Sequence, residues 1–193
     1  VDPKAVTPLV IGVSGLEFVG DTGVITVGVA DGITSGVSLT VDGVSYTGTY
    51  DANVFSFVIG GLSAGEHIVN VTYEGSDVFA FAKNGTTFNV FKRESGINVT
   101  ASGFVNGSAS VNVTVTQGVT GYVVVSVNGT DYTINLTAGQ DRIDLVGLSP
   151  GNYPVVVTYT GDDKFNASTN VTSFVVDPKA VTPLVIGVSG LEF

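Results

Sequence analysis

The sequence contains no cysteine, methionine or tryptophan and only one histidine. Without cysteine there is no disulfide bond, no thiol chemistry and no thiolate metal site, so hydrophobic cores must hold the folded chain. Basic residues are also scarce, because 17 Asp and Glu stand against 7 Lys and Arg, which gives a net charge of −10. Nucleic acids and anionic lipids are bound through clusters of Lys and Arg, so this balance argues against both as partners.

The sequence also lacks long apolar runs and helical periodicity. No stretch reaches the roughly 18 consecutive apolar residues of a membrane-spanning helix, so we expect no membrane insertion in this segment. No stretch repeats its apolar residues with a period of 3.6, so we expect almost no helix. Hydrophobic residues nevertheless make up 44% of the chain, which is enough for a folded core.

The same 18 residues, VDPKAVTPLVIGVSGLEF, occupy positions 1–18 and 176–193. Identity of this length predicts a tandem array with a unit of 175 residues, of which this chain is one unit and the opening of the next. A fainter repeat lies inside the unit, where GLSAGEHIVNVTYEGSDVF (61–79) and GLSPGNYPVVVTYTGDDKF (147–165) share eleven of nineteen positions at an offset of 86. We therefore expect two homologous modules, 1–92 and 93–178, followed by 179–193 as the first strand of another first module, a copy of 4–18.

Each module shows short stretches in which apolar and polar residues alternate, the pattern of half-buried β-strands. Ile25, Val27 and Val29 form one such series, and Val123, Val125 and Val127 form another in the second module. Asp-Gly at 42–43 and Asn-Gly at 128–129 follow alternating stretches and predict two-residue hairpin turns. About seven such strands per module predict an all-β fold of two tandem immunoglobulin-like seven-stranded β-sandwiches.

One stretch carries a family resemblance. GLSPGNYPVVVTYTGDDKFNAST, with its G-L-x-x-G-x-Y, V-T-Y and Y-x-G-D-D elements, resembles the immunoglobulin-like tandem repeats of adhesin-like surface proteins of methanogenic archaea and of bacteria. The resemblance covers nearly the whole unit, although the first module departs from it at His67, where the second module has Tyr153. It implies an extracellular, cell-surface protein with a structural or adhesive role, and it implies no particular ligand.

The single histidine has no second histidine or cysteine with which to form a metal or catalytic site. Its alignment with Tyr153 favours a packing and hydrogen-bonding role near the start of a strand, similar to a tyrosine corner.

Asparagine is the most informative polar residue, because nine of the chain's asparagines begin an N-x-[ST] sequon. Ser and Thr total 38 of 193 residues, which would give only two or three sequons by chance, so the excess favours a glycosylated surface protein. The alternative is that Asn and Thr are simply suitable for turns and exposed strand positions. The candidate N-glycosylation sites are Asn70, Asn84, Asn98, Asn106, Asn112, Asn128, Asn135, Asn166 and Asn170.

Asp162 and Asp163 are adjacent carboxylates that could contribute ligands to a metal site. Calcium takes six to eight oxygen ligands, and two carboxylates in one loop supply too few. Aspartate side chains also stabilise turns by accepting bonds from backbone N–H groups, and we favour that interpretation. No cofactor is therefore expected, with calcium as the weaker alternative.

An enzymatic function is not expected. Serine and threonine are abundant, but no base accompanies them as a nucleophilic site would need, and most carboxylates fall in turns or between modules. No glycine-rich phosphate loop is present. The absence of tryptophan also argues against an aromatic platform for carbohydrate.

The sequence favours a structural repeat unit of a long extracellular surface fibre or adhesin stalk. The short connection 91–96 and the proline-containing connection 175–184 predict stiff joints. The alternative is an adhesin module that binds a glycan or a host protein through loops at one end of the sandwich, within 31–36, 74–86 and 160–170.

The expected partner is the protein itself. Simple continuation into the next repeat is the favoured interpretation of 184–193, and donation of this strand to a neighbouring subunit is the alternative.

Overall fold

The computed structural model describes residues 3–136, 139–181 and 183. Within these ranges all regular secondary structure consists of β-strands, and no helix is long and apolar enough to cross a membrane. The described residues form two compact units, one of those up to 94 with 161–166 and the other of those from 95 to 160 with those that follow 166. The all-β prediction is confirmed, whereas most of the segment 179–193, expected to begin another module, lies outside the described residues.

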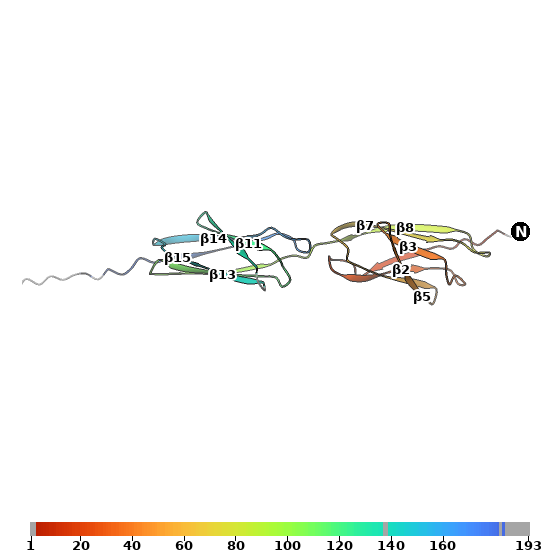
Figure 1. Ribbon diagram of the computed structural model, residues 1–193, viewed down its shortest axis with the longest axis horizontal. Helices are drawn as coiled ribbons and strands as arrows, with labels where there is room; N and C mark the ends of the chain where they lie inside the picture. Colours follow the sequence, from red (N-terminus) through yellow and green to blue (C-terminus); the bar gives the residue numbers. More distant parts are fainter. Residues whose placement is uncertain (1–2, 137–138, 182, 184–193) are drawn as a thin grey trace, which may run out of the picture. The chain divides into compact units, whose positions relative to one another are not determined.

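The first unit is a sandwich of two four-stranded antiparallel sheets. One sheet has the order β1-β2-β6-β5 and the other β4-β3-β7-β8, and Figure 1 shows β2 and β5 in one layer with β3, β7 and β8 in the other. The strands are β1 (Val10–Ser14), β2 (Thr22–Gly28), β3 (Val37–Val41), β4 (Val44–Tyr46), β5 (Gly48–Asp51), β6 (Val54–Gly60), β7 (Gly65–Tyr73) and β8 (Ala82–Val90).

The second unit pairs a three-stranded sheet, β13-β10-β9, with a four-stranded sheet, β12-β11-β14-β15. Its strands are β9 (Ile97–Phe104), β10 (Ser108–Val115), β11 (Tyr122–Val127), β12 (Thr130–Asn135), β13 (Gln140–Leu145), β14 (Gly151–Tyr159) and β15 (Ser168–Val176). These seven strands match the predicted number. The first unit has one strand more, because β5 pairs with β6 as an additional edge.

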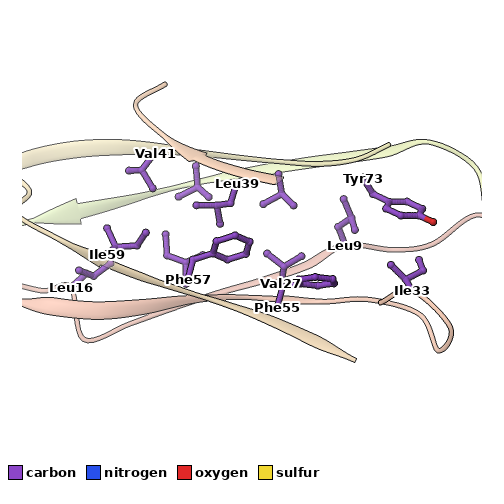
Figure 2. Close-up of a cluster of buried hydrophobic side chains, with 13 residues drawn as sticks. Leu9, Leu16, Val27, Ile33, Leu39, Val41, Phe55, Phe57, Ile59 and Tyr73 are labelled. Carbon is purple, nitrogen blue, oxygen red and sulfur yellow. The ribbon is translucent and has the colours of Figure 1, made fainter. Parts of the chain in front are cut away.

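The core of the first unit lies between its two sheets. Figure 2 shows side chains from the two layers pointing toward one another, with Leu39 and Val41 opposite Phe57 and Val27. Ile25 and Val27 are fully buried on β2, as the alternation in the sequence predicted. Burial of such side chains contributes about 1.5–3 kcal/mol each, which is what a disulfide-free domain requires.

Both predicted hairpin turns are present and have left-handed backbone. Asp42 and Gly43 have φ of 50° and 82°, and Asn128 and Gly129 have φ of 48° and 85°. Positive φ at both central residues defines the type I′ turn, whose twist matches that of the strands it joins. These turns connect β3 to β4 and β11 to β12.

The predicted binding loops 74–86 and 160–170 were too long. Residues 82–86 belong to β8, where Asn84 pairs with Val71, and residues 168–170 belong to β15, where Asn170 pairs with Val157. Pairing of β8 along the full length of β7 holds residues 84–86 in the sheet.

Candidate functional site

The nine sequons divide into groups by the contacts of their asparagine side chains. Those with exposed side chains on strand faces or turns, and with no bond from their amide nitrogen to the rest of the described chain, are Asn70, Asn98, Asn106, Asn112, Asn128 and Asn135. Asn70, Asn98, Asn112 and Asn135 lie on strands with exposed side chains. Asn166 donates from Nδ2 to the Glu94 carboxylate over 2.8 Å.

Asn84 and Asn170 occupy equivalent places and make equivalent bonds. Asn84 Nδ2 donates to the Leu9 carbonyl over 2.7 Å, and its Oδ1 accepts from the Gly85 amide. In the second unit Asn170 Nδ2 donates to the Ile97 carbonyl over 2.6 Å, and its Oδ1 accepts from the Val171 amide. Each side chain therefore ties the last strand of its sandwich to the backbone at the start of the first. We call this contact the asparagine clasp.

Replacing the half-buried Asn170 with Asp should destabilise the second unit by about 1 kcal/mol, the usual net contribution of one hydrogen bond. The carboxylate cannot donate, and it places a negative oxygen against the Ile97 carbonyl. Urea unfolding with hydrogen exchange on β9 and β15 measures the change. Asn98→Asp is the matched control, because Asn98 is an exposed sequon residue in the same unit and gains the same charge. Equal stability of the two variants contradicts the clasp.

His67 lies at the start of β7 and is 5% exposed. Its Nδ1 lies 2.6 Å from Asp42 Oδ2 and its Nε2 lies 2.8 Å from the Ser63 carbonyl. Both partners are acceptors, so the ring can satisfy both only as the doubly protonated imidazolium. The other carboxylate oxygen of Asp42 accepts from the Ile68 amide, and the Phe88 ring lies 5.5 Å from the imidazole between centroids.

The second unit builds the same corner without charge. Tyr153 Oη donates to the Ser149 carbonyl over 2.9 Å, four residues back, as His67 does to Ser63. The Tyr153 ring stacks on Phe174 at 5.2 Å, as His67 packs near Phe88. The predicted role of His67 as the counterpart of Tyr153 is confirmed, although its bond to the hairpin residue Asp42 was not predicted.

Burial alone lowers the pKa of His67, but the bonds to Asp42 and to the Ser63 carbonyl outweigh it and hold the pKa above its ordinary value of 6.5. The same bond from His67, with that from the Ile68 amide, lowers the pKa of Asp42 below 3.8. A raised histidine pKa stabilises the fold below pH 6.5, and this contribution is lost as the pH rises through the folded-state value. A lowered aspartate pKa stabilises the fold above pH 3.8, and this contribution is lost on acidification.

The first unit should therefore lose about 1 kcal/mol of unfolding free energy as the pH rises from below 6.5 through the raised folded-state pKa of His67, while the second unit does not. The magnitude is at the low end for a charged hydrogen bond because the Asp42 side chain is 43% exposed and solvent screens the pair. Hydrogen exchange resolved by unit measures this. His67→Tyr, which reproduces the corner of the second unit, should abolish the difference. Persistence of the pH dependence in that variant contradicts the assignment to His67.

The acidic pair lies between β14 and β15. Asp162 Oδ1 accepts from the Lys164 and Phe165 amides, each over 2.7 Å, which is the turn-stabilising role favoured from the sequence. Asp163 is exposed beside it. Among the described residues no three His, Cys, Asp or Glu side chains gather in a way that could hold a metal ion.

Aromatic residues of the candidate binding loops have different environments. Phe165 is 7% exposed and Phe79 packs against the core of the first unit, so both serve packing. Phe81 is 58% exposed, and Val78, three residues earlier in the sequence, is 65% exposed. These two side chains are the apolar surface that the loop 74–81 offers to solvent.

Comparisons with known proteins find similar solved structures but no similar family or curated protein. No family model matches the sequence, and no curated protein matches it. Among solved structures, the fibronectin(III)-like modules of Clostridium thermocellum CbhA are 16% identical, with a TM-score of 0.37 over 89% of this chain and 94% of that one. A two-domain fibronectin type III segment of chicken tenascin is 14% identical, with a TM-score of 0.37 over 86% of this chain and 98% of that one.

The central fibronectin-III array of RIM-binding protein is a third similar structure. It is 17% identical, with a TM-score of 0.36 over 91% of this chain and 71% of that one. At these identities and scores, the architecture of this chain is established by its own strand order and cores.

Proposed function

We propose that this chain is a non-catalytic structural repeat unit of a long extracellular surface fibre or adhesin stalk. The observation that carries the proposal is the repeat itself: residues 4–18, which complete the core of the first unit through Leu9 and Leu16, recur letter for letter at 179–193. A segment with that role in one sandwich is the expected opening of another. Repetition of disulfide-free β-sandwiches joined by short connections then sets the length of the fibre and its resistance to unfolding under force.

Microscopy and force measurements test the structural role. Native material in negative stain should show uniform unbranched fibres. A polypeptide of several 175-residue units, stretched as a single molecule, should unfold in discrete steps of similar length, one for each sandwich. Isolated compact particles in the native material, or extension without discrete unfolding events, would contradict the proposal.

Glycosylation belongs to the same proposal. The six exposed sequon residues whose amide nitrogens make no bond to the described chain are accessible as candidate acceptor sites, whereas Asn84 and Asn170 use this nitrogen in the asparagine clasp. Glycopeptide mass spectrometry of the native protein should find glycans among the exposed sites and none at the two clasp sites. A protein without any glycan removes this part of the proposal and leaves the structural role in place.

A second candidate function is adhesion to a glycan or host protein. The exposed Phe81 and Val78 favour it, because apolar and aromatic side chains on a loop are typical of binding surfaces. Glycan arrays and cell-binding assays with Phe81→Ser beside the unaltered chain test this function. Binding that depends on Phe81 supports it, and absence of binding by either protein rejects it.

A further inference from the structure

Residues 4–18 of the first unit occupy a groove that the remaining strands form between them. β1 pairs with β2 from Val10 opposite Gly28 to Ser14 opposite Val24. Leu9 and Leu16, which flank β1, are 5% and 4% exposed and belong to the core. The segment therefore fills an apolar groove at the edge of the sheet, which we call the first-strand groove.

The groove also recognises the backbone and polar groups of this segment. Thr7, 3% exposed, accepts a bond at Oγ1 from the Ala30 amide. The Leu9 carbonyl accepts from Asn84 of the asparagine clasp. These bonds fix the register, because a shift of one residue would turn Leu9 and Leu16 out of the core.

Short parallel bridges hold both ends of the segment. Ala5 N donates to the Val78 carbonyl over 3.0 Å, and the Ala80 amide donates to the Ala5 carbonyl over 2.9 Å. At the other end the Phe91 amide donates to the Glu17 carbonyl over 2.8 Å. The groove therefore contacts the segment from about Lys4 to Glu17. Lys4 Nζ also donates a hydrogen bond to the Ser76 carbonyl.

Every residue that the groove contacts in 4–18 is present again in 179–193, with Thr182, Leu184 and Leu191 in the places of Thr7, Leu9 and Leu16. We propose that the first-strand groove also accepts residues 179–193 of a second copy of the chain, so that chains join by exchange of an identical strand. The inference goes beyond the proposed surface role, because it concerns self-association wherever the protein resides.

Energetics set the conditions under which exchange occurs. The contacts of the two strands with the groove are the same, so no contact energy is gained or lost when one replaces the other. The N-terminal copy has an advantage because it is tethered to the groove in the same chain. The tether gives it an effective concentration on the order of millimolar. Dilute unaltered chain therefore remains monomeric, and exchange appears when the N-terminal copy is weakened. Donor and acceptor surfaces differ, so the product is a ring or an open chain of molecules.

Leu9→Asp with Leu16→Asp, in the full chain, weakens the N-terminal copy and leaves the C-terminal copy intact. We expect this variant to sediment at two or more times the monomer mass. The assembled fraction should increase as the protein concentration is raised from about 1 µM toward the millimolar range, which is the effective concentration of a tethered strand. Hydrogen exchange in β2 and β6 should be protected in the assemblies. Leu184→Asp with Leu191→Asp should remain a folded monomer, because the N-terminal copy still fills the groove.

The variant with all four substitutions is the decisive control, because neither copy of the segment then fits. It should be monomeric, with β2 unprotected, and a synthetic peptide of residues 179–193 should restore that protection, whereas the peptide with both leucines replaced by Asp should not. The inference is overturned if Leu9→Asp with Leu16→Asp stays monomeric and as unprotected as the fourfold variant. It is also overturned if the fourfold variant assembles equally, or if the peptide fails to protect β2.

Discussion

Phe57→Ala should lower the unfolding free energy of the first unit by about 3–5 kcal/mol, the range measured for large-to-small changes at buried aromatic sites. Phe57 lies on β6, in the middle of its sheet, and is 1% exposed. Its ring lies against Gly48 of β5, where an added Cβ would come within 2.6 Å of the ring. The ring therefore covers a position that has no side chain of its own, and its removal leaves a cavity.

A loss of this size is a large part of the stability of a single domain, which is typically about 5–15 kcal/mol. Val58→Ala, at the next position on the same strand, is the matched control, because Val58 is 65% exposed and should change stability by no more than about 0.5 kcal/mol. Urea unfolding with unit-resolved hydrogen exchange measures both variants, and the second unit serves as an internal reference. Similar losses at the two positions would contradict the assignment of inner and outer faces on β6.

Much of this architecture follows from the alternation of apolar and polar residues. Ile25, Val27 and Phe57 are inward-facing in the sequence pattern and buried in the structure. The reason is that a strand with one buried face has only one register that keeps its apolar residues in the core. The Asp-Gly and Asn-Gly pairs located two hairpins for a similar local reason, since few other residues adopt positive φ in both turn positions.

Features that depend on contacts between distant segments could not be predicted in this way. β5 has the sequence Gly-Thr-Tyr-Asp, without an apolar alternation, and it exists because β6 offers it a free edge. The asparagine clasp joins residues that are 75 positions apart in the first unit and 73 positions apart in the second. In the sequence its asparagines do not differ from those of the other sequons. The shared offset of 86 between Asn84 and Asn170 was the one available signal, because both modules retain the residue at the same place.

The His67 corner shows what an internal repeat does and does not reveal. Alignment with Tyr153 predicted a hydrogen bond to the backbone nearby, and each ring bonds the carbonyl four residues before it. The charge pair with Asp42 was hidden, because it depends on the hairpin between β3 and β4 lying beside β7. The second module has Asn128 at the equivalent turn position, so we expect the pH dependence in the first module only.

Gly103→Ala should destabilise the second unit by at least about 2 kcal/mol, as overpacking against backbone does. A Cβ at this position of β9 would lie 2.1 Å from the carbonyl oxygen and 2.7 Å from the carbonyl carbon of Val175 on β15. The obstacle is backbone, so no side-chain rotation relieves it, and the first strand would have to move away from the last. The substitution therefore opposes the close approach of the strands that the Asn170 clasp also joins.

Gly151→Ala separates this effect from the general consequence of adding a methyl group to a strand glycine. Gly151 begins β14 in the same unit, and the nearest atom that its Cβ would meet is 4.0 Å away. Alanine there should be neutral or slightly stabilising, because it reduces the freedom of the unfolded chain. Hydrogen exchange of β9 and β15 should accelerate in Gly103→Ala and not in Gly151→Ala. Unchanged exchange in both would mean that the two strands do not approach so closely, and the proposed groove for a first strand would then lack its counterpart in the second sandwich.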